Sequence, residues 1–146
     1  MSKIKNLLAG LAGAVALNIL HESLKKTSSD MPRVDLLGEE ALQKTIQYFG
    51  GNLDHKKDLY KATLAGDILG NTLYYSLIGA GNPKYLWPKV AMMGLSAGIG
   101  AVSLPEPMGL DPEPVAKNNQ VKALTVGYYV IGAVVTGLAL NLLKKY

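Results

Sequence analysis

Four apolar segments constrain the fold of this chain more than any other feature of its sequence. A transmembrane helix needs roughly 20 predominantly apolar residues to cross the hydrocarbon core of a bilayer, and each segment approaches that length. They cover about residues 4–24, 59–80, 85–104 and 121–143. We therefore predict a single membrane domain over residues 1–146, an all-α integral membrane four-helix bundle. A soluble helical bundle is the alternative.

Glycine is frequent inside these segments, and this favours the membrane over the soluble bundle. Of the 146 residues, 16 are glycine, and a glycine inside a water-soluble helix costs about 1 kcal/mol relative to alanine. Membrane helices instead use small residues to approach one another closely. We expect such helix packing, within one chain or between chains, at Gly66, Gly70, Gly94, Gly98 and Gly132.

The first apolar segment shares some features with a secretory signal. Lys3 and Lys5 precede it, as basic residues precede the apolar core of a signal peptide. However, the segment continues into His21 and Glu22 without a small-x-small cleavage site. We therefore interpret it as an uncleaved first span.

The connections between the segments differ in kind. Residues 35–49 place apolar side chains roughly on one face, which predicts a short amphipathic helix in the first loop, lying at the membrane interface or capping the bundle. Residues 81–84 are few enough to make a tight helical hairpin. The Pro-rich residues 105–114 predict an extended connector, with a partner-binding strip as the alternative.

Charge indicates the orientation. With four spans, both termini and the hairpin turn lie on one side, which has only basic charges, and every carboxylate except that of Asp67 lies on the other side. Lys and Arg are enriched on the cytoplasmic side of membrane proteins, so we expect cytoplasmic termini and a cell-membrane location in contact with lipid. The formal net charge is only +4, and the lysines are not interleaved with aromatic residues, which argues against nucleic acid as a partner.

A polar stripe in the first two segments is the candidate functional feature. Polar residues follow i, i+3, i+4 spacing near the end of the first segment, and i, i+4 spacing inside the second. A rise of 1.5 Å per residue brings both stripes to a similar depth below the long first loop, where the fourth segment offers tyrosines. We predict one polar cluster at this depth, formed by Asn18, His21, Glu22, Asp67, Asn71 and Tyr129.

This cluster has three interpretations. Its members form hydrogen bonds between helices, bind an ion, a proton or a small molecule, or contact a partner subunit. An acid inside a span is costly and points to function, so Asp67 should face the bundle interior and be protonated or paired. The chain has no cysteine and no phosphate-binding or metal-binding motif, so we predict no catalytic, cofactor or metal site.

Three stretches of the chain share a further likeness. They are His21-Glu22 followed by residues 32–38, the run 66–75, and residues 104–110. Together they resemble small, uncharacterised multi-pass membrane proteins of bacteria, over most of the chain. The resemblance implies a bacterial inner membrane and no known activity.

Two functions are compatible with these features. The first is a structural or accessory component of the membrane that self-associates as a homo-oligomer or packs on a larger complex. The alternative is a small proton- or ion-coupled transporter or channel that uses the cluster around Asp67. A membrane enzyme comes third, because the cluster has an acid and a histidine but no nucleophile. A water-filled cavity reaching Asp67 would favour transport, and a dry, packed Asp67 would favour scaffolding.

Overall fold

The chain is all-α. A computed structural model describes residues 2–145, with 78% helix and no strand within that range. The all-α prediction is therefore confirmed. The helices are α1 (Lys3–Leu24), α2 (Val34–Tyr48), α3 (Lys56–Ser76), α4 (Leu86–Ser103), α5 (Glu113–Ala116) and α6 (Asn119–Lys144), with the 3-10 turns η1 (Leu77–Gly79) and η2 (Pro83–Tyr85) between α3 and α4.

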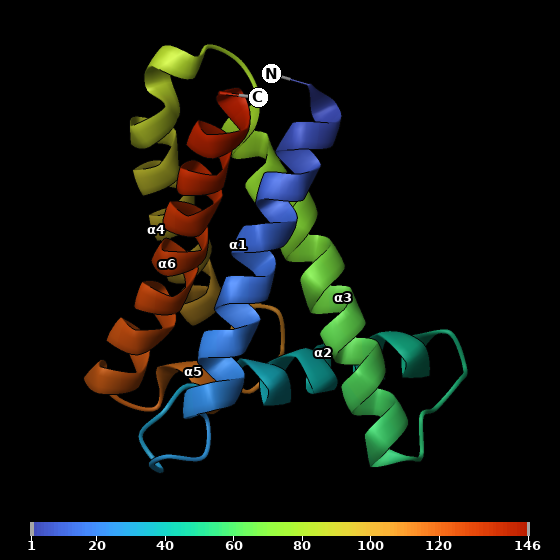
Figure 1. Ribbon diagram of the computed structural model, residues 1–146. Coiled ribbons are helices and arrows are strands. Elements are labelled where there is room, and N and C mark those ends of the chain that lie inside the picture. The colour runs from blue at the N-terminus through green and yellow to red at the C-terminus, as the bar shows by residue number, and fades with distance from the viewer. Residues whose placement is uncertain (1, 146) are drawn as a thin grey trace.

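Four long helices lie side by side in the spatial order α3, α1, α6, α4 (Figure 1). α1 packs against both α3 and α6, and α6 packs against both α1 and α4. The two ends of the chain lie together at one end of the bundle, called here the terminal end. There Lys5 Nζ donates a 3.0 Å hydrogen bond to the carbonyl of Leu143, so that a cation occupies the C-terminal end of α6.

The hairpin of α3 and α4 is tight at the terminal end and open at the other. η1 and η2 join the two helices, which then diverge towards the opposite end, called here the loop end (Figure 1). α2 lies across the loop end and packs against α3. The divergence of α3 from α4 leaves a groove between them that α2 borders.

The observed helices cover the predicted segments, and the second segment differs most. It was expected to be one helix over residues 59–80, but α3 begins at Lys56 and ends at Ser76, and a 3-10 turn follows. The α-helix cannot continue much further because Gly81 has a φ of +79° and Pro83 follows it. The amphipathic helix expected at residues 35–49 is present as α2.

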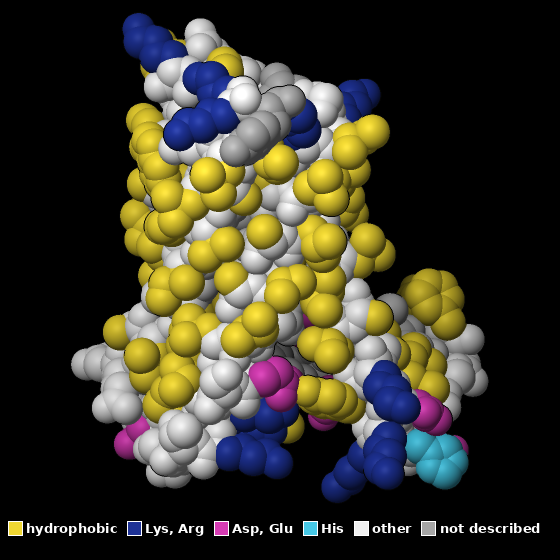
Figure 2. All heavy atoms as spheres, in the orientation of Figure 1, with side chains coloured by type: hydrophobic (Ala, Val, Ile, Leu, Met, Phe, Trp, Pro, Cys, Tyr) yellow, Lys and Arg dark blue, Asp and Glu magenta, His cyan; other side chains and the backbone are white. Residues whose placement is uncertain are grey.

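Two of the described helices, α1 and α6, are long and apolar enough to cross a membrane, with mean hydropathies of 1.5 and 1.8. α3 and α4 do not reach this composition, although four such helices were predicted. α3 has Lys56, Lys57 and Asp58 in its first turn, and α4 has Lys89 in its own. The surface between the two ends of the bundle is nevertheless rich in hydrophobic side chains (Figure 2). α1 and α6 are compatible with a membrane location.

Three of the predicted packing glycines lie where helices approach closely. A Cβ at Gly98 would lie 2.6 Å from an α6 backbone carbon, and one at Gly94 would lie 3.0 Å from another. A Cβ at Gly132 would collide with the ring and hydroxyl of Tyr75. That hydroxyl donates a 2.8 Å hydrogen bond to the carbonyl of Tyr129. These glycines therefore let α4, α6 and α3 approach closely enough to pack.

The prediction is wrong for packing within this chain at Gly66 and Gly70. Both are exposed, and a Cβ at either would meet no atom within 4 Å. They lie on the outer face of α3, beside the exposed Leu69 and Leu73. α3 instead packs on α1 at Gly10, where an added Cβ would collide with the carbonyl of Thr72. The sequence spacing showed a small-residue face but not which way it points.

Candidate functional site

A network of charged side chains joins three helices at the loop end. Its centre is Asp35 in the first turn of α2, which is 6% exposed. Arg33 donates two hydrogen bonds to the Asp35 carboxylate, from Nε at 3.0 Å and from Nη2 at 2.9 Å. His21 Nε2 lies 3.2 Å from Oδ1, and Lys25 Nζ lies 3.4 Å from Oδ2. The end of α1 is thereby fixed to the start of α2.

These partners determine the charge state of Asp35. Burial alone would raise its pKa, but the close contacts of His21 and Arg33 with the carboxylate outweigh burial and hold the pKa far below its usual range. The same pairing raises the pKa of Arg33. Asp35 is therefore a carboxylate at every physiological pH, and the network is a permanent ion cluster.

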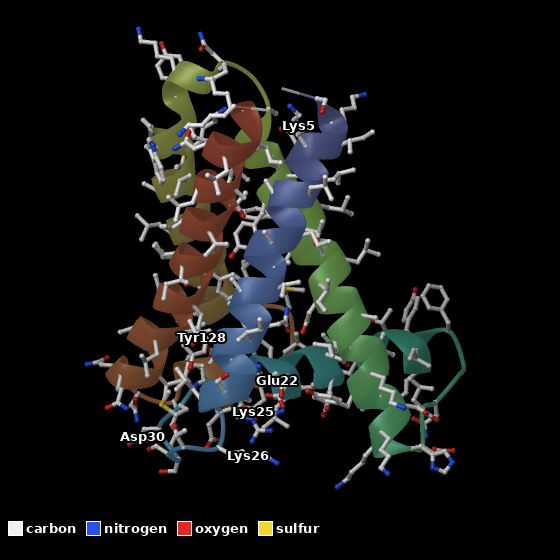
Figure 3. The ribbon with its side chains drawn as sticks, viewed as in Figure 1. Lys5, Glu22, Lys25, Lys26, Asp30 and Tyr128 are labelled. Carbon is white, nitrogen blue, oxygen red and sulfur yellow. The ribbon has the colours of Figure 1, made fainter. Side chains whose placement is uncertain are left out.

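Glu22 extends the network from α1 to α3. Its carboxylate oxygen Oε2 lies 2.8 Å from Lys25 Nζ, and its Oε1 accepts a short hydrogen bond from the Tyr60 hydroxyl. The Lys25 ammonium also lies 4.8 Å from the centre of the Tyr60 ring, within the range of a cation–π contact. In Figure 3, Glu22 and Lys25 lie together at the loop end of α1, far from Lys5 at the terminal end. Both carboxylates of this network, Asp35 and Glu22, are thus paired with cations.

A small polar chamber lies immediately inside the network. Its volume is about 10 Å³, which is the space that one water molecule needs. Two polar atoms of its lining, His21 Nε2 and Thr63 Oγ1, are buried without a well-aligned hydrogen bond. The chamber is lined by Asn18, His21, Glu22, Asp35, Tyr60, Thr63, Leu64 and Asp67. It admits nothing larger than water.

A much larger groove lies on the other side of Asp67. It has a volume of about 450 Å³, is open to the outside, and fills the space between α3 and α4 where the hairpin diverges. α2 and the segment after α4 border it at the loop end. Its lining is mainly apolar or small: Val34, Leu37, Gly38, Ala41, Tyr74, Ser96, Ala97, Gly100, Ala101, Leu104, Pro105, Met108, Leu110 and Tyr129, together with Asp67.

Asp67 is the residue that the chamber and the groove share. It is partly buried, and no hydrogen bond or ion pair connects it to any residue within 2–145. A Cβ at Gly38 of α2 would lie 2.7 Å from the Thr63 methyl group and 3.6 Å from both carboxylate oxygens of Asp67, so glycine at this position lets α2 approach α3 closely beside Asp67. Asp67 thus combines two properties that are costly together: partial burial and the absence of a partner.

The bundle is closed beyond the groove, towards the terminal end. Tyr75, Ile78 and Ala133 are fully buried there, with 0% exposure. Tyr74 connects α3 to α4 by donating a 2.9 Å hydrogen bond to the carbonyl of Met93. The groove therefore reaches Asp67 from one side of the bundle and does not continue through its core.

The structure brings together four of the six residues of the predicted polar cluster. Asn18, His21, Glu22 and Asp67 line one chamber, and Tyr129 meets Asp67 in the groove instead. Asn71 lines neither, because the α3 lining of the chamber ends at Asp67, one turn earlier. Asn18 donates its side-chain hydrogen bond to Ala14 of its own helix, at 2.9 Å, and so does not connect helices.

The predicted cluster did not include Asp35, Tyr60 and Thr63. Thr63 belongs to the polar stripe of the second segment, one turn before Asp67, and Tyr60 lies about two turns before it, so the helical spacing already contained both. Asp35 lies at the start of the helix predicted in the first loop, and only Arg33, two residues earlier, indicated an ion pair. Among the residues that the structure describes, no group of three or more His, Cys, Asp or Glu is placed to hold a metal ion.

Comparison with family models, curated proteins and solved structures finds no match for this chain. A compensated ion cluster fixes α2, and one uncompensated carboxylate faces an apolar groove. The first arrangement is structural, and the second can bind a ligand or a proton.

Proposed function

We propose that this protein is a small integral membrane protein in which all four long helices cross the bilayer, and that it acts as a structural or accessory component of the membrane. The carrying observation is the position of its exposed apolar side chains. Every long helix exposes several of them between the two ends of the bundle, a pattern that a soluble monomer rarely shows. Examples are Leu8 and Ile19 on α1, Leu69 and Leu73 on α3, Met92 and Ile99 on α4, and Leu138 and Leu142 on α6.

The charges support the same placement. Lysines lie at the terminal end and the ion cluster lies at the loop end, while the apolar surface occupies the length between them (Figure 2). The charged first turn of α3 lies at the loop end, where headgroups and water solvate it. α3 can therefore cross the membrane with the apolar part of its length although its overall composition is less apolar.

The accessory role is supported by the outer face of α3. Gly66 and Gly70 are exposed there between the large side chains of Leu69 and Leu73. A glycine pair at i, i+4 on a lipid-facing helix lets a second helix approach its backbone closely. We propose that this face of α3 packs on a second copy of the chain or on a larger membrane complex.

Single-cysteine cross-linking tests this proposal directly, because the chain has no cysteine of its own. Gly70→Cys in native membranes should form a disulfide-linked species with a second copy or another protein. Leu138→Cys, on the exposed face of α6, is the matched control and should not. The accessory proposal fails if both variants stay uncross-linked, or if a carbonate wash without detergent extracts the protein.

A second function, proton- or ion-coupled transport, is favoured by one observation. Asp67 is not packed dry but lines an open groove and has no partner among the described residues. The closed core around Tyr75 opposes it, because transport would require that layer to open. Measurement of proton or cation flux in vesicles, for the wild type and Asp67→Asn, separates this function from the accessory role.

A further inference from the structure

We propose that the groove between α3 and α4 binds a lipophilic amine, a molecule whose aliphatic body fills the groove and whose ammonium group pairs with Asp67. The inference rests on the proposed membrane location, from which such a molecule would enter sideways. It goes beyond that proposal by assigning a ligand class to the groove.

The shape of the groove fits a small molecule. Its volume of about 450 Å³ lies within the range of sites for drug-sized ligands. Small residues create the space, because Ser96, Ala97 and Gly100 of α4 and Gly38 of α2 all line the groove. Leucine at these positions would fill it. The apolar lining suits an aliphatic body, and the volume is too small for a long partner helix.

The charge of the groove identifies the head group. Asp67 is the sole Asp or Glu of the lining, and the lining contains no Lys, Arg or His. The basic groups nearest to Asp67 already have carboxylate partners: Arg33 pairs with Asp35, Lys25 with Asp35 and Glu22, and His21, which shares the small chamber with Asp67, lies 3.2 Å from Asp35. A positive partner for Asp67 must therefore come from outside the described chain. In a low-dielectric groove such a pair is stronger than in water.

Two tyrosines reinforce the preference for a cation. Tyr74 and Tyr129 line the groove together with Asp67. An ammonium close to tyrosine rings gains a cation–π attraction in addition to its ion pair. A fatty acid would instead place a second carboxylate beside Asp67, which like-charge repulsion disfavours. An alcohol of equal chain length would make a hydrogen bond but no ion pair.

The test uses the full chain in phosphatidylcholine nanodiscs and three radiolabelled probes of equal chain length: dodecylamine, dodecanol and dodecanoate. Empty nanodiscs of the same lipid give the partition baseline. Above that baseline, the wild type should bind dodecylamine saturably and at least about tenfold more tightly than dodecanol, because a charge-assisted hydrogen bond is about twice as strong as a neutral one. Dodecanoate should bind most weakly.

Variants assign the binding to the groove. Asp67→Asn keeps the shape of the side chain and should reduce the amine-to-alcohol preference to near unity. Ala97→Phe should fill the groove and abolish saturable binding of both probes, and Ala101→Phe provides a second filling variant if the first does not fold. Leu95→Phe, on an exposed part of the same helix, is the matched control and should bind as the wild type does.

The outcomes separate this inference from the proposed function. Failure of the wild type to enter nanodiscs would overturn the membrane location, and the amine site with it. Entry without saturable dodecylamine binding would overturn the amine site alone, as would an amine preference that Asp67→Asn leaves unchanged. Tighter binding of dodecanoate than of dodecylamine would show that the groove takes the opposite charge.

Discussion

The imidazole Nε2 of His21 lies 3.2 Å from Oδ1 of Asp35, so that the last turn of α1 is joined to the first turn of α2 through side chains that are both buried. Since Arg33 and Lys25 reach the same carboxylate, one residue fixes the position of α2. In that position α2 forms the border of the groove at the loop end.

Removal of Asp35 should therefore loosen α2 and destabilise the bundle. Asp35→Ala leaves His21 and Arg33 without their partner and should lower the free energy of unfolding by roughly 1–3 kcal/mol. Thermal unfolding in detergent, followed by circular dichroism, measures the change. Asp54→Ala, at an exposed loop position, should leave the midpoint close to that of the wild type. Equal midpoints for all three proteins would show that the ion cluster does not stabilise the fold.

Acid should remove the same stabilisation. Because its partners hold the pKa of Asp35 far below the ordinary value of 3.8, Asp35 takes up a proton at a lower pH in the folded state than in the unfolded state. Its contribution is fully present above the unfolded pKa and is lost as the pH falls below it towards the folded pKa. The stability difference between wild type and Asp35→Asn should therefore shrink below about pH 4. A difference that stays constant down to pH 2 would contradict this assignment.

Two glycines of α6 should respond differently to the same substitution. Gly132→Ala should destabilise by roughly 1–3 kcal/mol, because the new methyl group collides with the buried Tyr75 ring. Gly127→Ala adds the methyl group where no atom lies within 4 Å, and should leave stability unchanged or raise it by up to about 1 kcal/mol, because alanine favours the helix. Unfolding midpoints of the two variants give the comparison. A neutral Gly132→Ala would show that α3 and α6 can separate at no cost.

Asp67 should lower the free energy of unfolding of the wild-type protein. Its carboxylate is partly buried without a hydrogen bond or ion pair, so Asp67→Leu should raise stability by about 1 kcal/mol. Unfolding in detergent without added ligand is the measurement. A loss of stability would mean that Asp67 has a partner in the folded protein, and would weaken the case for a ligand site.

The proposed topology makes a separate prediction. Cysteines introduced at Ser2 and Lys145 should react with an impermeant maleimide from the same side of the membrane, and a cysteine at Asp54 from the opposite side. The terminal positions lie together at one end of the bundle, and the loop between α2 and α3 lies at the other. Labelling of Ser2→Cys and Lys145→Cys from opposite sides would exclude four crossings.

Local sequence signals predicted the five longer helices well, whereas α5 and the turns before it form where an extended connector was expected. Each longer helix follows an apolar or amphipathic run, and residues such as Gly81 and Pro83 end or separate them for reasons of backbone geometry. His21 and Asp67 line the same chamber because the regular rise of α1 and α3 brings both residues to a similar depth below the loop end.

The rest of the site depends on how the helices are turned and tilted, which local signals do not contain. The Gly66–Gly70 spacing is typical of packing, yet α3 turns that face outwards because its contacts with α1 use Thr72 and Ser76. Asp35 meets His21 only because α2 lies across the loop end. The groove itself is a consequence of the tilt of α3 and has no sequence motif.

The spatial order α3, α1, α6, α4 also has a consequence for biosynthesis. α4 follows α3 in the chain but packs along its length on α6, which is synthesised later. Until α6 is present, the glycine face of α4 has no helix to pack on, and α1 has a neighbour on one side only. Completion of the bundle should therefore await α6, and nascent chains that stop before residue 119 should remain accessible to proteases or chaperones at α4.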